Sequence, residues 1–163
     1  MSILGDKGGL ILKIKKTNNP EYGYKNKDEL YLETQQHRVD VARLMSFIAL
    51  ELNEIGYRHD WSKIEYFDQF AKDTLERQDT PDFKSRDWYK VHTKEERHHL
   101  NANTPKDVDL LDVLEFICDC VVAGKSRTGR VEKKYLELSA VILKQAFWNT
   151  VNKIIDEVEV EED

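Results

Sequence analysis

Residues 28–55 read DELYLETQQHRVDVARLMSFIALELNEI. Apolar side chains recur along this stretch at the spacing of one helix face, at Leu30, Val41, Leu44, Ile48 and Leu52. Gly56 follows, and glycine is a common residue just after the end of a helix. The stretch therefore predicts a long first helix. Because the whole chain of 163 residues contains only three prolines, we expect an all-α fold, a compact bundle of five or six helices.

The signals for further helices lie downstream of this segment. Residues 62–65 and 93–96 both have the S/T-x-x-E form of a capping box. Thr104-Pro105 is an N-cap residue followed by proline at the first helical position. Helices are therefore expected over residues 62–78, 93–101 and 104–123, with a last one from about residue 131.

The two ends of the chain differ from this helical body. Residues 1–27 contain the glycine-rich GDKGG and an alternating LILKIKK, which predict an irregular extension with a short strand or hairpin at most. The last 13 residues contain six acidic residues and one lysine, so most of the net charge of −6 lies there. We expect an extension over residues 1–27, a helical domain over 28–157 and a frayed acidic tail over 158–163.

Composition narrows the class of protein. Charged residues make up 34% of the chain, and no apolar run approaches the ~18 residues that a membrane helix needs. Charges beside the short apolar patch at the N-terminus argue against a signal peptide. A near-neutral body argues against general nucleic-acid binding, and the spacing of Cys118 and Cys120 argues against a disulfide. We therefore expect a cytoplasmic protein without membrane or general nucleic-acid partners.

The order of histidines and acidic residues is the strongest indication of chemistry. His37 is followed by the pair His59-Asp60, then by further histidines and by acidic residues of the helix expected over 104–123. The three acids of that helix share one face because they are spaced i, i+3 and i+7: Asp112, Glu115 and Asp119. Imidazoles and carboxylates together suit a divalent ion such as Mn, Fe, Co, Ni, Zn or Mg.

This order resembles the HD-domain superfamily, whose all-helical members are metal-dependent phosphohydrolases with a spaced His, a His-Asp pair and a later Asp. HDWSK (59–63), the H-x5-HH spacing (92–99) and LLDVLEFICDCVVAGKSR (110–127) are more closely similar to a small HD-like family of bacteria and phages. The resemblance covers about residues 30–127. It implies the following metal ligands: His37, His59, Asp60, His98, His99 and Asp119.

The resemblance also implies a reaction, since one or two divalent ions would activate water against a phosphoester of a nucleotide or related small molecule. Three residues near the expected ligands are candidates for catalysis: Lys63, Glu65 and His92. Lys125 and Arg127 are candidates for binding a substrate phosphate. Glu115 is expected to contact a metal ligand without binding the metal itself, and so to orient that ligand.

Two alternatives stay open at this point. Glu51-x-x-Glu54 is similar to the paired acidic helices of all-helical nucleotide pyrophosphohydrolases, with Asp112 and Glu115 as partner acids. That interpretation would leave the histidines without a role. The chain could also be a non-catalytic protein that binds a metal or nucleotide and acts on a partner, for example one encoded by a phage. The sequence leaves the number of ions, the substrate and the oligomeric state open.

Overall fold

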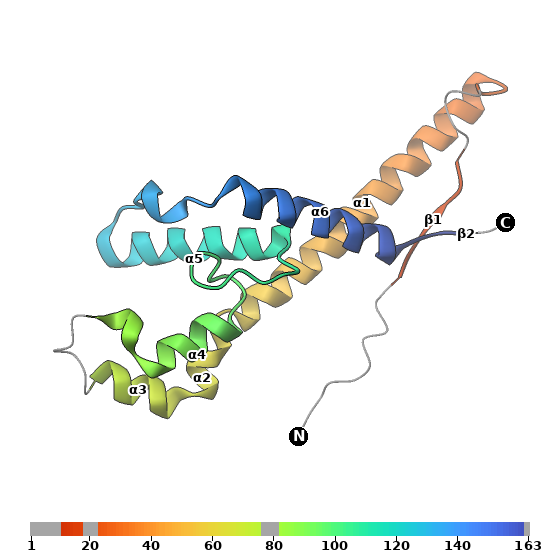
Figure 1. The fold of residues 1–163 in the computed structure, drawn as a ribbon. Coiled ribbons are helices and arrows are strands. Elements are labelled where there is room, and N and C mark those ends of the chain that lie inside the picture. The colour runs from red at the N-terminus through yellow and green to blue at the C-terminus, as the bar shows by residue number, and fades with distance from the viewer. Residues whose placement is uncertain (1–10, 18–22, 76–81, 162–163) are drawn as a thin grey trace. The chain divides into compact units, whose positions relative to one another are not determined.

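The computed structural model describes residues 11–17, 23–75 and 82–161. Within these ranges the chain is mostly helical, and the all-α prediction is confirmed. Figure 1 shows the elements, whose bounds are α1 (Lys27–Arg58), α2 (Trp61–Glu65), α3 (Phe67–Leu75), α4 (Asp87–Glu95), α5 (Leu110–Thr128), α6 (Ala140–Glu157), the 3-10 turns η2 (Phe83–Ser85) and η3 (Lys133–Leu136), and the strands β1 (Leu12–Lys15) and β2 (Val158–Glu161). None of the helices in the described part of the chain combines the length and hydropathy of a membrane span.

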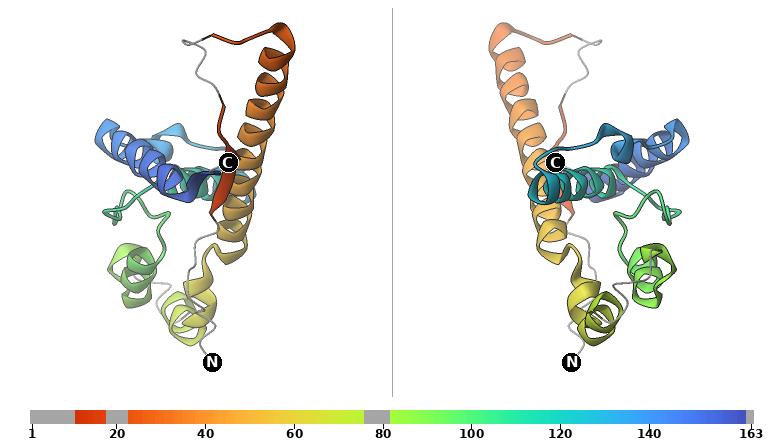
Figure 2. Two further views of the ribbon diagram at one scale, coloured as in Figure 1. Left: turned by 90° about the vertical axis from the view of Figure 1, so that its right-hand side faces the viewer. Right: turned by 90° about the vertical axis from the view of Figure 1, so that its left-hand side faces the viewer.

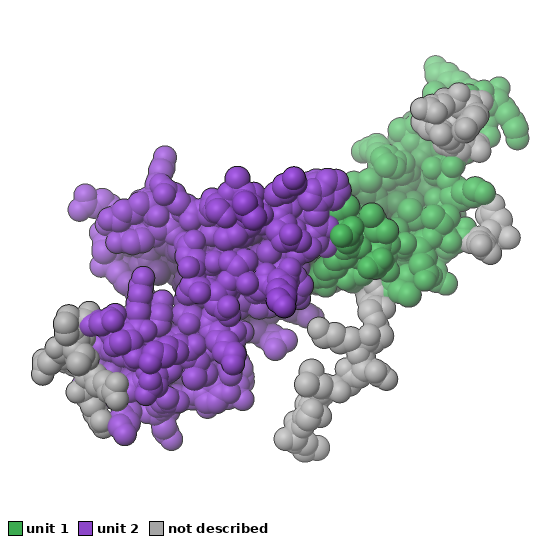
Figure 3. Space-filling model, in the orientation of Figure 1, with its two compact units in different colours: residues 1–51, 151–163 green, residues 52–150 purple. Residues whose placement is uncertain are grey.

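The chain divides into two compact units, coloured separately in Figure 3. One unit comprises residues 1–51 and 151–163, and the other comprises residues 52–150. Both α1 and α6 therefore contribute to each unit. The segment boundaries expected at residues 27/28 and 157/158 stay predictions.

The first unit joins the two ends of the chain in a parallel strand pair (Figure 1). Leu12 and Ile14 lie opposite Val158 and Val160, so apolar residues pair with apolar residues. Lys13 and Lys15 lie opposite Glu159 and Glu161, so basic residues pair with acidic residues. Arg43 of α1 donates a hydrogen bond of 2.9 Å to the Lys13 carbonyl. The expectation that residues from 158 onward fray is therefore wrong for Val158–Glu161, because their acids face lysines of β1. The GDKGG segment lies outside the described residues.

The second unit has its core around α5. Buried apolar side chains come from this helix, from the segment before it and from α6: Leu100, Val108, Val113, Phe116 and Ala146. In Figure 2, α5 and the first part of α6 lie side by side. This core fixes α5, which carries Glu115 and Asp119.

Four of the expected helix starts are wrong. Asp60, not Ser62, is the N-cap residue of α2, and the helix expected over residues 62–78 is divided at Tyr66. The expected end near residue 78 lies outside the described residues. The segment 87–95 is helical instead of 93–101, so His98 and His99 lie in the turn that follows α4. The last long helix begins at residue 140 and not near 131.

The start of α5 shows why sequence signals for caps can mislead. The Asp109 carboxylate accepts hydrogen bonds from the N–H groups of Leu111 and Asp112, and Asp112 accepts one from the Asp109 N–H. These reciprocal bonds satisfy free backbone donors at the helix start. Thr104 instead donates its hydroxyl to the Leu100 carbonyl at 2.6 Å, so the Thr104-Pro105 start is wrong.

Candidate metal centre

Asp60 forms the sharp corner between α1 and α2. Its φ of 59° makes it the one residue other than glycine with a left-handed backbone in the described ranges. Aspartate tolerates this conformation better than most residues, and such strained residues often occur at functional sites. Although Asp60 occupies the N-cap position, its side chain makes no capping hydrogen bond. Its carboxylate therefore remains directed at other groups.

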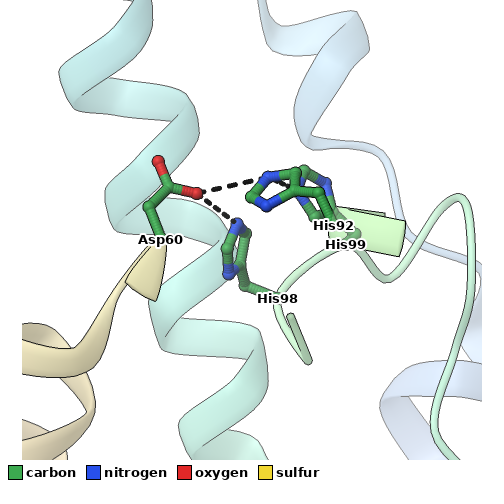
Figure 4. A group of neighbouring side chains, drawn as sticks. All are labelled: Asp60, His92, His98 and His99. Carbon is green, nitrogen blue, oxygen red and sulfur yellow. Dashed lines mark hydrogen bonds and ion pairs between the residues drawn. The ribbon is translucent and has the colours of Figure 1, made fainter. Parts of the chain in front are cut away.

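Those groups are three histidines of α4 and the following turn: His92, His98 and His99 (Figure 4). Together with Asp60 they could hold a metal ion, and we call these four residues the first ligand group. His92 Nε2 lies 3.3 Å from Asp60 Oδ1, and His98 Nε2 lies 3.7 Å from the same oxygen. His99 Nε2 lies 2.7 Å from His92 Nε2. One ligand atom from each of the four residues lies within 4.8 Å of the others.

The unsatisfied polar atoms of this group fit a bound cation. Asp60 Oδ1 and His98 Nε2 are buried without a hydrogen bond, and His98 is only 1% exposed. Leaving a buried polar atom unpaired costs about 1–3 kcal/mol. Two atoms that each lie about 2.1 Å from one ion are about 3.0–3.4 Å apart at octahedral or tetrahedral angles. The separations of 3.3 and 3.7 Å from Asp60 Oδ1 are close to this range, so the donor set suits a divalent cation.

A second ligand group comprises His59, His98 and Asp119, and it shares His98 with the first. His59 Nε2 lies 3.6 Å from Asp119 Oδ1 and 3.5 Å from Asp60 Oδ2. His59 follows the last residue of α1, whereas Asp119 lies on α5. The two oxygens of Asp60 thus face different groups, with Oδ1 directed at His92 and His98 and Oδ2 at His59.

Glu115 lies behind two of these imidazoles. Its Oε1 is 2.9 Å from His59 Nδ1 and 3.1 Å from His98 Nδ1. A carboxylate at Nδ1 orients a histidine so that Nε2 faces a metal, and it makes the ring a stronger ligand. Burial raises the pKa of Glu115, but its hydrogen bonds with His59 and His98 outweigh burial and lower that pKa to about 2. Glu115 therefore stays ionised behind the cluster.

Ser62 orients His92 as Glu115 orients His59 and His98, and the sequence analysis did not predict this role. The buried Ser62 hydroxyl lies 2.7 Å from His92 Nδ1, and the Ser62 N–H donates to Glu96 Oε1 at 2.7 Å. With Nδ1 engaged by the hydroxyl, His92 presents Nε2 to Asp60. The capping box predicted for Ser62 and Glu65 is therefore wrong. The signal that could have identified it is its place in HDWSK, two residues after Asp60.

The pKa values divide the histidines into two kinds. Hydrogen bonds with Asp119 and Glu115 raise the pKa of His59 to about 10, so His59 is an imidazolium near neutral pH. Burial lowers the pKa of His92 well below its usual value, and burial together with His98 lowers the pKa of His99 to about 4. His92 and His99 are therefore neutral and have a lone pair to offer a cation.

A pocket of about 480 Å³ opens onto this cluster. Asp60, His92, His99 and Asp119 line one part of it. Three cationic side chains also line it: Lys63, Arg127 and Arg130. Three aromatic side chains also line the pocket: Trp88, Tyr89 and Tyr135. Arg130 was not predicted individually, but it lies in the basic stretch KSRTGRVEKK (125–134), whose five basic residues and one acid are a sequence signal for an anion-facing patch.

The structure brings together most of the residues that the sequence singled out. The two ligand groups contain the following predicted ligands: His59, Asp60, His98, His99 and Asp119. His92, predicted to be catalytic, lies in the first ligand group. Lys63 and Arg127 line the pocket, whereas Lys125 and Glu65 are exposed and do not line it.

His37 does not join either ligand group and is exposed in the first unit. Residues 37–58 form one uninterrupted part of α1, which agrees with the long first helix expected from residue 28. His37 therefore belongs to neither ligand group among the described residues, and its assignment as a metal ligand stays a prediction.

Comparison with known proteins identifies a family but no function. The chain matches a protein family described as a family of unknown function (DUF5662) over residues 26–158. No curated protein and no solved structure matches the chain.

Proposed function

The chain belongs to the DUF5662 family, and we propose that it is a metal-dependent hydrolase of phosphoesters, with a nucleotide or related small molecule as substrate. One observation carries this proposal. Asp60 Oδ1, buried and without a hydrogen bond, faces His92 and His98 beside a pocket that three cationic side chains line. This combines groups that hold a cation with groups that bind an anion.

The ligand types indicate which ions would bind. Imidazole and carboxylate ligands together suit Mn, Fe, Co, Ni or Zn better than Mg, which prefers oxygen ligands. A divalent cation held there would polarise a phosphoryl oxygen and lower the pKa of a bound water. Glu115 and Ser62 would keep the imidazoles oriented toward the cation through their contacts at Nδ1.

The charge of the pocket supports a phosphate group as its ligand. Three cationic and three acidic side chains line the pocket, the acids being Asp60, Asp119 and Glu132. These charges cancel, so a bound divalent cation would leave an excess of two positive charges. A phosphate monoester carries two negative charges once its second proton, with a pKa near 6, has been lost. Arg127 and Arg130 offer planar guanidinium groups that match phosphate oxygens.

The remaining lining supports a nucleotide-sized substrate. The pocket volume of about 480 Å³ lies within the usual range for small-molecule sites. Tyr89 and Tyr135 offer aromatic surfaces to a base or another planar group. A cytoplasmic location would also suit the chain, because Cys118 and Cys120 are both unpaired thiols.

Two of the four acids of the pyrophosphohydrolase alternative, Glu51 and Asp112, have partners outside the candidate metal centre. Lys153 donates to Glu51 at 2.9 Å, and Arg97 donates twice to the buried Asp112, at 2.7 Å each. Neither acid belongs to a ligand group in the described part of the chain. The non-catalytic alternative, in which the same site holds a metal or nucleotide for a partner, is separated from hydrolysis by experiment.

The experiment uses Mn²⁺-loaded protein with nucleoside monophosphates, diphosphates, cyclic nucleotides and an aryl phosphate. We expect release of phosphate or nucleoside from at least one of them, and loss of that release after chelation. Asp60→Asn should abolish turnover, whereas the exposed Asp68→Asn on α3 should not change it. Full metal content without turnover of any compound would favour the non-catalytic alternative, and absence of metal binding would refute the site itself.

A further inference from the structure

The two carboxylate oxygens of Asp60 contact different groups. Oδ1 is buried and has no hydrogen bond, and it faces His92 and His98. Oδ2 forms an ion pair with the Lys63 ammonium. A carboxylate that bridges two metal ions must offer one oxygen to each ion. In this chain a lysine already holds the second oxygen.

The fold keeps Lys63 at this position. Lys63 follows Asp60 by three residues, and its N–H donates to the Asp60 carbonyl at 3.0 Å within the first turn of α2. The side chains of Lys63 and Asp60 are only 26% and 24% exposed, so their attraction is less screened than that of a surface pair. Lys63 also lines the pocket beside His92 and Asp119. Its ammonium therefore lies where the Asp60 carboxylate meets the space open to a ligand.

His98 cannot complete both ligand groups at once. Its Nδ1 lies 3.1 Å from Glu115 Oε1, which leaves Nε2 as the atom directed at Asp60. If Nε2 binds an ion in the first group, the second group retains only His59 and Asp119. The further oxygen near His59, Asp60 Oδ2, is engaged by Lys63. Two side chains are fewer than the three that a catalytic metal site normally supplies.

We infer that the centre takes one divalent cation, held by Asp60 Oδ1, His92 and His98, and that the Lys63 ammonium occupies the place of a second cation. This inference rests on the proposed function, because it assumes that the cluster binds metal. It assigns to Lys63 the positive charge that a second ion would otherwise present to a substrate phosphate.

The test counts ions per chain with Mn²⁺ alone as the probe. Chelator-treated full-length protein is titrated with Mn²⁺, bound metal is measured by elemental analysis after gel filtration, and the electron paramagnetic resonance spectrum reports whether bound ions are magnetically coupled. Three variants accompany the wild type: Lys63→Met, Lys63→Arg and the exposed Lys72→Met on α3. Circular dichroism verifies that each variant is folded.

We expect one ion per chain in the wild type, in Lys63→Arg and in Lys72→Met. Lys63→Met frees Asp60 Oδ2 beside His59 and Asp119, so it should bind a second ion and show a coupled spectrum. Adding Asp119→Asn to Lys63→Met should return the count to one. Two ions in the wild type, or one ion in folded Lys63→Met, would overturn this inference and leave the proposed function standing. No bound ion in any variant would refute both.

Discussion

Glu115→Gln tests whether the groups behind the imidazoles support metal binding. The substitution keeps the size of the side chain but removes the charge that lies 2.9 Å from His59 Nδ1 and 3.1 Å from His98 Nδ1. Loss of such a supporting group typically lowers metal affinity 10- to 100-fold, which corresponds to about 1.4–2.7 kcal/mol. Because Glu115 contacts the Nδ1 atoms of two histidines, one of which is a ligand in the first group, we expect a fall of about 30-fold or more.

The assay is competition between the protein and a coloured chelator for Mn²⁺ or Zn²⁺ at pH 7.5. Glu132→Gln is the matched control, because Glu132 also lines the pocket but its carboxylate pairs with Lys134 at 2.6 Å. The control should bind metal within about twofold of the wild type. Equal affinity of Glu115→Gln and wild type would refute the supporting role, and so would an equal loss in both variants.

Three further predictions concern stability and substrate binding. The metal-free protein should be most stable near pH 6.5. The pKa of His59 is raised to about 10, so its contribution to the free energy of unfolding is lost as pH rises from 6.5 through 10. The pKa of His99 is lowered to about 4, so its contribution of about 2 kcal/mol, which allows for partial exposure, is lost as pH falls from 6.5 through 4. Urea unfolding with a chelator present measures both limbs, and rising stability from pH 6.5 down to 4 would contradict the assignment. Arg97→Met leaves the 3% exposed Asp112 carboxylate without its two hydrogen bonds from Arg97, and should cost about 2–4 kcal/mol in the same measurement at pH 7; a loss below about 1 kcal/mol would contradict that. Arg127→Ala should raise KM about tenfold on a confirmed substrate with a smaller change in kcat, and unchanged kinetics would place Arg127 outside the binding site.

The fold class and most of the cluster follow from local sequence features. Helical spacing of apolar residues predicts α1 because burial repeats with the helix period. The order of the histidines and acids carries the resemblance that implied the metal ligands, and the structure brings His59, Asp60, His98, His99 and Asp119 into its two ligand groups. These residues were identified by type and order, which do not depend on where each helix begins.

Features that depend on competition between local signals were not predictable in this way. Thr104-Pro105 is a sound N-cap pattern, but the reciprocal bonds of Asp109 and Asp112 start α5 five residues later. Ser62 has the pattern of a capping residue, yet its hydroxyl binds His92, which lies 30 residues further along the chain.

Pairing between distant segments was also beyond the sequence signals. The strand pair of Leu12–Lys15 with Val158–Glu161 joins the two ends of the chain, and nothing near either strand specifies its partner. Likewise, a histidine within an amphipathic helix has no local feature that tells a ligand from a solvated side chain. His37 was therefore assigned by its order alone, and the uninterrupted α1 leaves it outside the cluster.

The proposed reaction requires that Asp60, His92 and His98 hold a catalytic cation. Anomalous diffraction from a crystal soaked in Mn²⁺ tests it most directly, because the signal locates the ion without reference to any substrate. We predict one strong peak about 2.0–2.3 Å from Asp60 Oδ1 and the Nε2 atoms of His92 and His98. A peak coordinated by His37, or full Mn²⁺ occupancy elsewhere with none between these three residues, would contradict the account.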